Sequence, residues 1–505
     1  MTHRSSVLLA VLALAGPAWL VAAAPGSAAA APTTCAGKPV TIVATTTVTH
    51  GTEGDDVVAM EPGQWNTFDA GAGDDTVCLA AGRADINDRD SRPPAGFLDA
   101  GTGDDTVVNL TPSDTTGMIF TTVVLGLGDD SFQGSDIGEE VFAETRTADY
   151  DDPYAVDPAF TGSQTDVITS AATVYSAAPN DGANQDQITF GSADARMVIG
   201  GTLAPEGRVD VSAAASATLE IRRPSGLRPS APADVTVDNG ARAVTVAGAS
   251  VLTWTGDFDI VNLGRPQLRP DEPAVSFTGT DASETVNVTD LPIGRISLGD
   301  GRDKLFVNSL NSPYIPRTAD GGPGRDWFVV FAVCRSLTVR LGAGSACDDV
   351  TGDVSDFSSV AVATEVTGST ATLRGTGRGE RLSARGVHVV VRGRAGADTI
   401  VADGLASARV HAGTGADDVV GYADDLVAMG QGGRDRIEVA ASTDPRPADR
   451  RQRVALGGAG DDVLVGSRDT RRERLVGGLG KDRADGRKGR RDFCDAEVRL
   501  RCERP

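Results

Sequence analysis

Aspartate residues that close short glycine-rich segments are the side chains of this sequence with the clearest chemical potential. The hexapeptide G-G-x-G-x-D occurs at residues 457–462, 477–482 and 321–326. Glycine adopts backbone angles that other residues avoid, so such a segment can curl with its carbonyl groups on one side. Calcium takes about six to eight oxygen ligands from carboxylates and carbonyls. The candidate calcium-site residues in these copies are Gly458, Gly460, Asp462, Gly478, Gly480, Asp482, Gly322, Gly324 and Asp326.

Further segments carry part of the same phrase. Between Glu380 and Asp435 the acids recur at a nearly constant step, through Asp398 and Asp417. This spacing matches the length of one solenoid coil with a strand on each side. Each coil then places its turn directly above the turn of the preceding coil, so an ion can lie between two successive turns. The additional candidate residues are Gly301, Asp303, Gly396, Asp398, Gly415, Asp417, Gly433, Asp435, Gly73, Asp75, Gly103, Asp105, Gly128 and Asp130.

The complete copies resemble the haemolysin-type (RTX) calcium-binding repeat, G-G-x-G-x-D-x-U-x, in which U is a large apolar residue. The resemblance covers residues 51–132 and 279–485, with a gap between them. It implies an all-β parallel solenoid, a β-roll or β-helix, in which Ca²⁺ ions join coil to coil. Most coils here carry the phrase once, so we expect the Gly-Asp turns to stack on one edge.

The copies in residues 51–132 each lack one glycine of the phrase, with Thr52, Ala70, Ala100 and Leu125 in place of it. The loss weakens the geometry of the turn but leaves the carboxylate. An alternative remains open for this block, namely Gly-Asp turns that make local side-chain hydrogen bonds without a metal.

Short runs rich in Val, Ile, Thr and Ala, separated by turns, predict strands and not helices over most of the chain. We predict a signal peptide at 1–31, a first solenoid block at 32–135, a repeat-poor β region at 136–275, the main repeat solenoid at 276–485 and a C-terminal cap at 486–505. The repeat-poor region is predicted as metal-free solenoid coils, with an inserted β-sandwich as the alternative. The arginines of the tail suit a solvated cap or, alternatively, a site for an acidic polymer.

The N-terminus predicts export, because Arg4 precedes an apolar run and a small-residue cleavage region. A membrane anchor is the alternative for this segment, and no other stretch is apolar enough over a membrane-spanning length. The sequence contains six cysteines, an even number that favours disulfides in an exported protein. Fifteen pairings are possible, and proximity in the sequence favours 35–78, 334–347 and 494–502.

The formal net charge of −23 disfavours nucleic acid as a partner and suits cations. No H-E-x-x-H, G-x-S-x-G or Walker-type motif is present. We therefore predict a secreted, non-enzymatic, calcium-binding scaffold or adhesion protein, with an extracellular polysaccharide as a candidate partner. The alternative is a β-helical polysaccharide lyase or epimerase with structural calcium, for which a groove of clustered Arg, Lys, Asp and aromatic residues would be evidence.

Overall fold

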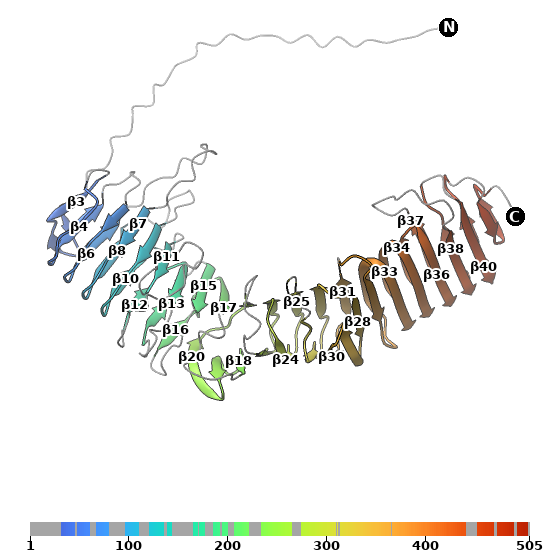
Figure 1. The fold of residues 1–505 in the computed structure, drawn as a ribbon, viewed down its shortest axis with the longest axis horizontal. Coiled ribbons are helices and arrows are strands. Elements are labelled where there is room, and N and C mark those ends of the chain that lie inside the picture. Colours follow the sequence, from blue (N-terminus) through green and yellow to red (C-terminus); the bar gives the residue numbers. More distant parts are fainter. Residues whose placement is uncertain are drawn as a thin grey trace, which may run out of the picture.

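A computed structural model describes residues 32–502 except 46–47, 61–66, 80–95, 111–120, 136–138, 144–164, 170, 177–184, 192–193, 200–206, 222–233, 265–273, 310, 312–313, 365, 441–451, 469–471 and 489–491. The predicted signal peptide lies outside these residues. The described residues form strands and turns, and none of them is helical. Figure 1 shows the strands following one another along a curved axis, which gives the molecule the shape of an arc. Within the described part, no helix has the length and apolarity needed to span a membrane.

The first part of the chain begins with a separate two-stranded antiparallel sheet, formed by the first two strands, and then contributes strands to the faces of the coils. They are β1 (Thr34–Cys35), β2 (Lys38–Pro39), β3 (Ile42–Ala44), β4 (Val57–Met60), β5 (Thr67–Asp69), β6 (Thr76–Leu79), β7 (Gly96–Asp99), β8 (Thr106–Asn109), β9 (Thr121–Val124), β10 (Ser131–Gln133), β11 (Glu139–Phe142), β12 (Val167–Thr169), β13 (Thr173–Ser176), β14 (Gln187–Thr189), β15 (Asp194–Ile199), β16 (Arg208–Asp210) and β17 (Ser216–Ile221).

The rest of the chain continues the same coiling. Its strands are β18 (Val235–Asp238), β19 (Ala243–Val246), β20 (Ala249–Thr255), β21 (Ile260–Leu263), β22 (Val275–Thr278), β23 (Thr285–Thr289), β24 (Ile293–Ser297), β25 (Lys304–Ser309), β26 (Thr318–Asp320), β27 (Trp327–Ala332), β28 (Ser336–Arg340), β29 (Ala343–Cys347), β30 (Val350–Ser355), β31 (Ser359–Ala363), β32 (Thr370–Arg374), β33 (Arg381–Ala395), β34 (Thr399–Thr414), β35 (Asp418–Tyr422), β36 (Asp425–Gly432), β37 (Arg436–Ala440), β38 (Arg453–Ala459), β39 (Val463–Val465), β40 (Glu473–Leu479), β41 (Arg483–Asp485), β42 (Phe493–Asp495) and β43 (Val498–Leu500).

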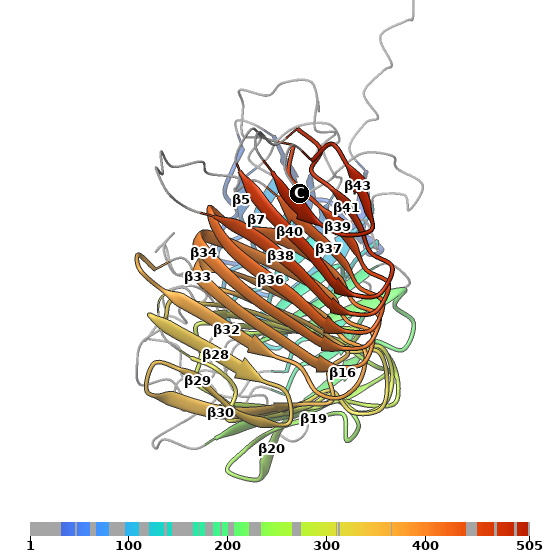
Figure 2. The same cartoon turned by 90° about the vertical axis from the view of Figure 1, so that its right-hand side faces the viewer.

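The alternation of residue types along each strand produces the core. In β25, for example, Leu305 and Val307 are buried while Lys304 is exposed, because successive side chains of a strand point to opposite faces. Most strands pair in parallel and in register with their equivalents on the next coil, as β25 does with β27. Buried apolar side chains therefore form one continuous cluster from Ala44 to Ala496. Figure 2 shows the coils stacked behind one another. The predicted all-β parallel solenoid is confirmed.

Two segments interrupt the parallel pairing. Strands β18, β19 and β20 form an antiparallel meander, and β28, β29 and β30 form another. The second contains residues 341–350, whose glycines and acids resemble a distorted repeat in the sequence but which form a hairpin and not a repeat turn. Strands β12–β17 of the repeat-poor region pair in parallel with the coils before them. Their described residues thus extend the solenoid, while the predicted domain boundaries stay predictions.

The pairing near residues 208–263 exchanges the roles of the two faces. In the first block, one set of strands begins just after the Gly-Asp turns, and β14 and its partner β16 belong to it. The other set ends just before those turns, and β15 and its partner β17 belong to it. Strand β16 then pairs with β20, and β17 pairs with β21, which in turn pairs with β23 on the following coil. In the second block β21 and β23 follow the Gly-Asp turns. Because paired strands run in the same direction, the turns of the two blocks lie at opposite ends of the strands.

Each block therefore stacks its own Gly-Asp turns along one edge, and the edge changes between the blocks. Close packing at the exchange supports this arrangement. A Cβ built on Gly256, in the first turn of the second block, would lie 2.7 Å from the backbone N of Ser212, which belongs to a connecting loop of the first block. The edge that carries the Gly-Asp turns in the second block is thus continuous with the edge that carries the connecting loops in the first block.

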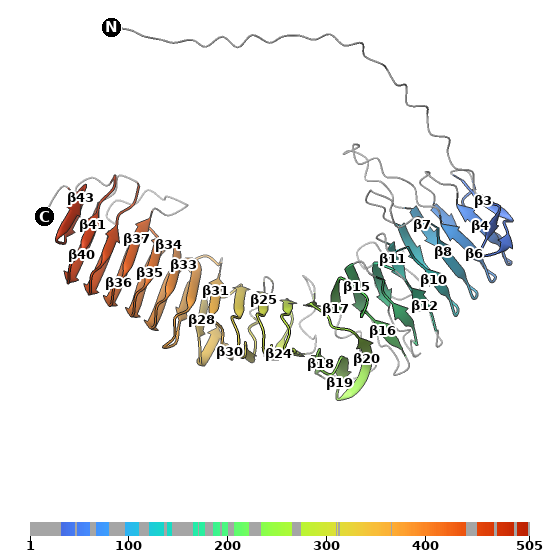
Figure 3. The same ribbon diagram turned by 180° about the vertical axis from the view of Figure 1, so that it is seen from behind.

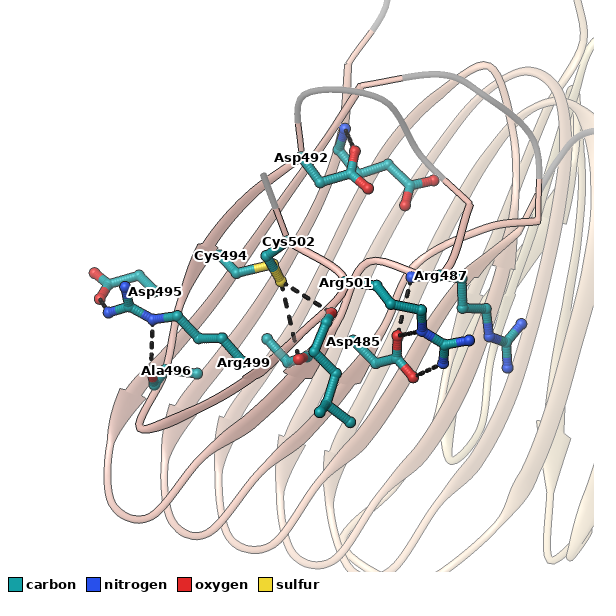
Figure 4. Close-up of a disulfide and its surroundings, with 12 residues drawn as sticks. Asp485, Arg487, Asp492, Cys494, Asp495, Ala496, Arg499, Arg501 and Cys502 are labelled. Atoms are coloured by element: carbon teal, nitrogen blue, oxygen red, sulfur yellow. Dashed lines mark hydrogen bonds and ion pairs between the residues drawn. A yellow bond between two sulfur atoms is a disulfide. The ribbon is translucent and has the colours of Figure 1, made fainter. Parts of the chain in front are cut away.

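Three disulfides join Cys35 to Cys78, Cys334 to Cys347 and Cys494 to Cys502, which are the pairs expected from the sequence. They indicate an oxidising compartment other than the cytoplasm. The last pair closes the final coil, where Arg501 also pairs with Asp485 (Figure 4). An end coil exposes unpaired strand edges, so covalent closure there protects against fraying.

Removal of the last disulfide by Cys494→Ser with Cys502→Ser should loosen the final coil. Closure of a loop of this size is worth about 2–3 kcal/mol in the chain-entropy account of disulfide stabilisation. We expect faster amide hydrogen exchange in β42 and β43 (residues 493–500), with exchange in β23–β27 unchanged. Equal acceleration along the whole solenoid would contradict a local role.

Candidate metal centre

Each Gly-Asp turn packs backbone against backbone on the turn of the preceding coil. Gly458 and Gly460 have φ angles of +119° and +137°, which favour glycine. A Cβ built on Gly460 would lie 1.6 Å from the carbonyl oxygen of Gly433, its equivalent one coil earlier. Gly415 and Gly433 are related in the same way, at 1.6 Å. The middle glycines of the phrase are therefore required both by backbone angle and by the close stacking of turns.

The acid that ends each turn is buried. All the aspartates predicted as calcium ligands have at most 2% of their surface exposed: Asp75, Asp105, Asp130, Asp303, Asp326, Asp398, Asp417, Asp435, Asp462 and Asp482. Each lies immediately before a strand that faces the core. The turn thus delivers its carboxylate into the space between coils, and not to the solvent.

Consecutive acids are joined by one repeated hydrogen bond. The backbone N–H of Asp462 donates to Oδ1 of Asp482 on the next coil, at 2.9 Å. The same bond, at 2.7–3.1 Å, links the other members of what we call the acid rows. The first row is Asp56, Asp75, Asp105, Asp130, Asp166 and Asp186. The second row has two runs, Glu284 to Asp326 and Glu380 to Glu497, the latter through Asp398, Asp417, Asp435, Asp462 and Asp482.

The second carboxylate oxygen of most row members has no hydrogen-bond partner and is shielded from solvent. These oxygens are Oδ2 of Asp75, Asp105, Asp130, Asp303, Asp326, Asp398, Asp417, Asp435, Asp462 and Asp482, and Oε2 of Glu284 and Glu380. In the terminal repeats this oxygen faces the first glycine of its own phrase. A Cβ built on Gly457 would lie 2.3 Å from Oδ2 of Asp462. The first glycine therefore leaves the space that the carboxylate occupies.

No described lysine or arginine forms an ion pair with the acids whose second oxygen is unpartnered. The opposite edge of the last coils behaves differently. There Arg453 is 1% exposed, lies 3.6 Å from a carboxylate oxygen of Glu473, and donates to Ser467 Oγ at 3.2 Å. An internal cation thus accompanies the buried acid on that edge, whereas the row acids with an unpartnered second oxygen have no such cation among the described residues.

Burial raises the pKa of several row carboxyls well above the usual value for aspartate. The pKa of Asp105 rises to about 8, and those of Asp130, Asp303 and Asp398 rise to about 7. Loss of solvation is the main cause, and neighbouring carboxylates add to it, while the bond from the adjacent N–H acts in the opposite direction. A buried carboxylate with one bonded oxygen holds its charge only when a cation compensates it.

The donor set fits calcium in its chemistry, since it consists of carboxylates and glycine-turn carbonyls. No three His, Cys, Asp or Glu side chains among the described residues lie close enough together to hold one ion. Some turn carbonyls are also engaged between coils, as Leu479 O accepts the N–H of Gly460 at 2.7 Å. An ion between two coils would thus take side-chain oxygens from at most two row members, and backbone carbonyls would complete its shell.

The second row is interrupted once, between Asp326 and Glu380. The intervening coil has the short turn 356–358, which places Ser358 where its neighbours have an acid. The N–H of Ser358 donates to the carbonyl of Asp326 at 3.2 Å. The shorter turn leaves a notch of about 930 Å³ on the edge, lined by Gly322, Gly324, Asp356 and Glu380 among others. The structure therefore divides the second row into two runs.

Four buried acids at turn ends were missed by the sequence reasoning. Asp166 and Asp186 extend the first row into the repeat-poor region, which was expected to lack such sites. Each has a glycine four residues before it and an isoleucine two residues after it, and this spacing was the available signal. Glu473 and Asp492 form the same bond on the opposite edge of the last coils, at 2.9 Å. Gly466 and Gly486 precede them, but without the complete phrase.

Comparison with known proteins gives no assignment. No protein-family model matches the chain, and no curated protein sequence matches it. The likeness to the haemolysin-type repeat thus rests on the quoted motifs, and membership of that family stays a hypothesis.

The calcium-free protein should lose stability as the pH rises. Row carboxyls with raised pKa values bind protons more tightly in the folded chain than in the unfolded chain, so their contribution is complete below about pH 4 and is lost progressively as the pH rises from about 4 to 8. We expect the Tm in chelator, followed by circular dichroism, to fall over this range. A Tm that is constant or rises from pH 6 to 8 would contradict the burial of charged groups without cations.

Substitution of the first glycine of a G-G-x-G-x-D motif should destabilise the turn, because the new side chain would contact the carboxylate that faces this glycine. Gly457→Ala places a methyl group 2.3 Å from Oδ2 of Asp462 and 2.5 Å from the carbonyl oxygen of Gly477, and overpacking of this kind costs about 1–3 kcal/mol. Gly432→Ala is the matched control, because a Cβ there meets nothing within 4 Å. Urea denaturation should show a lower midpoint for the first variant only. Equal midpoints for the two variants would show that the carboxylate is not held where the structure places it.

Proposed function

We propose that the protein is a secreted calcium-binding scaffold, in which calcium ions between coils neutralise the acid rows. The observation that carries this proposal is the set of buried, unpartnered second oxygens along the two rows. In the twelve row members with such an oxygen, hydrogen bonds account for one carboxylate oxygen and leave the other without a partner. A divalent cation with oxygen preference satisfies the remaining oxygen and the charge at once.

Calcium would then couple to folding. Stacked coils bring successive carboxylates within about one strand spacing, roughly 4.8 Å, where they repel one another when charged. Where calcium is scarce the coils would stay partly unfolded, and where it is abundant ions would hold them together. Extracellular modules commonly bind calcium with dissociation constants of about 10⁻⁴–10⁻³ M. Export before folding would suit such a chain.

The predicted signal peptide and the disulfides support release into an extracellular space. A scaffold or adhesion role, without catalysis, agrees with the use of the acids as a structural row. The histidines also have structural surroundings. His388 Nδ1 lies 2.8 Å from Ser407 Oγ on an exposed strand, and burial beside Arg392 lowers the pKa of His411. A polysaccharide lyase or epimerase remains the alternative, and release of unsaturated products from pectin- or alginate-like polymers would identify it.

The double variant Asp462→Asn with Asp482→Asn distinguishes a row that is stabilised by calcium from a row that is stabilised by hydrogen bonds alone. Asparagine keeps an oxygen for the neighbouring N–H but removes the charge. In the wild type, calcium at about a hundred times its dissociation constant should stabilise the fold by about 2.7 kcal/mol per site. The double variant should lose the calcium-dependent part of that gain and bind fewer ions, while its stability in chelator stays the same or increases.

Asp349→Ala is the control, since Asp349 is exposed and lies in the second hairpin, away from the acid rows. It should keep the full response to calcium. The measurements are thermal unfolding and calorimetric titration with and without calcium, together with a circular-dichroism titration of the calcium-free chain. If calcium changes neither the β signal nor the Tm of the wild type, the proposal is wrong.

A further inference from the structure

One outer surface of the solenoid differs from the rest of this acidic molecule. We call it the Trp327 face. It consists of the outward-register residues of β25, β27, β31 and β33, which pair in parallel as Lys304–Trp327–Ser359–Arg381 and so on along the strands. Its members are Lys304, Phe306, Asn308, Trp327, Val329, Phe331, Ser359, Ala361, Ala363, Arg381, Ser383 and Arg385.

Two aromatic rings stand exposed on this face. Trp327 has 44% and Phe331 has 46% of its surface exposed, and Val333, just beyond the strand, has 42%. Among the described large hydrophobic side chains, no other aromatic residue is so exposed. Phe306 lies beside Val329 on the adjacent strand and is half-buried. A solenoid needs no such rings for its own core, so an outward aromatic surface indicates contact with another molecule.

The charge of the face is opposite to that of the chain. The protein has a formal net charge of −23, yet the twelve positions of the face include Lys304, Arg381 and Arg385 and no acid. Arg385 has one neighbouring acid beyond the face, with its Nε 3.8 Å from Asp403. The next strand in the other direction, β23, adds only neutral outward residues. The face is thus complementary to an anionic partner.

The dimensions of the face favour a narrow partner. Lys304 and Arg381 are three strand spacings apart, about 14 Å, and Trp327 and Phe331 are four residues apart, about 13 Å. The resulting area of about 200 Å² is far below the roughly 800 Å² per partner of a stable protein interface. Figures 1 and 3 both place β25 and β31 on the inner side of the bend, and the concave side is where solenoids present extended binding surfaces.

We propose that the Trp327 face binds an acidic polysaccharide. The apolar faces of sugar rings would pack on the indole of Trp327 and the ring of Phe331, which present rigid apolar area. The carboxylate or sulfate groups of the polymer would meet the ammonium of Lys304 and the guanidinium of Arg381, and the guanidinium can donate two parallel hydrogen bonds to such an anion. This inference rests on the proposed extracellular role and names its partner, but it uses residues outside the acid rows.

Binding to polygalacturonate, measured by affinity electrophoresis at fixed calcium with dextran as the neutral polymer, tests the proposal. The variant Trp327→Ala with Phe331→Ala should bind at least about tenfold more weakly than the wild type. Lys304→Ala with Arg381→Ala should also weaken binding and reduce its dependence on salt. Val43→Ala is the matched control, because Val43 is 42% exposed in β3, at the N-terminal end of the arc (Figure 1), and it should bind as the wild type does.

Thermal unfolding with and without calcium separates this inference from the proposed function. The Trp327 and Lys304 variants should keep the full calcium response. Absence of polygalacturonate binding in a wild type that responds to calcium would overturn the polysaccharide inference alone. Equal binding to dextran, unchanged binding by the aromatic variant, or binding only to phosphatidylserine vesicles would overturn it too. So would a wild-type dimer in sedimentation that the aromatic variant abolishes, since the face would then join two copies.

Discussion

A carboxylate removed from water is the constraint on which this structure depends. Each coil ends a turn with an acid that points between the coils, and the N–H of the preceding coil occupies one of its oxygens. That bond aligns the coils but cannot remove the charge, and burial makes the charge expensive. The raised pKa values of Asp105 and Asp303 express the same cost. The fold is therefore linked to whatever neutralises the row, a proton or a metal cation.

The same bond fixes the register of the coils. Because side chains alternate between the two sides of a strand, a shift by one residue would move a carboxylate from the row to another position and expose the core residues behind it. The row can continue only where each turn has enough residues to reach inward. At residues 356–358 the turn is too short, and Phe357 packs near Phe328 instead, with ring centroids 5.3 Å apart. In each coil, the length of the turn thus decides whether the coil can place an acid in the row.

Much of this arrangement can be predicted from local sequence, because successive coils repeat one short sequence motif. The aspartates that end complete or partial phrases, such as Asp398 and Asp462, all lie in the rows. Two features could not be predicted in this way. The exchange of edges depends on which strands pair near residues 208–263, and pairing is not a property of a single phrase. Residues 341–350 contain glycines and acids in roughly the right order, but a disulfide and antiparallel partners make them a hairpin.

Asp166 and Asp186 show a further limit. Two residues before these acids the sequence has Gln and Asn where the motif has glycine, so a motif defined by glycine does not include them. Both acids are nevertheless buried, and each accepts the backbone N–H of the preceding acid in the row. The position of an acid relative to the following strand is thus a better guide than the glycines. The Trp327 face is another case, because its residues come from four strands whose alignment only the parallel register provides.

The buried guanidinium of Arg453 has a consequence for the order in which the chain assembles. On that side of the last coils the positive charge is covalently part of the protein, so its presence does not vary with the surrounding medium. A repeat array can begin to fold at any rung and then grow by addition of neighbours. The C-terminal coils contain the ion pair of Arg453 with Glu473 and the disulfide between Cys494 and Cys502. They are therefore the segment best suited to fold first and to serve as the template for the other coils.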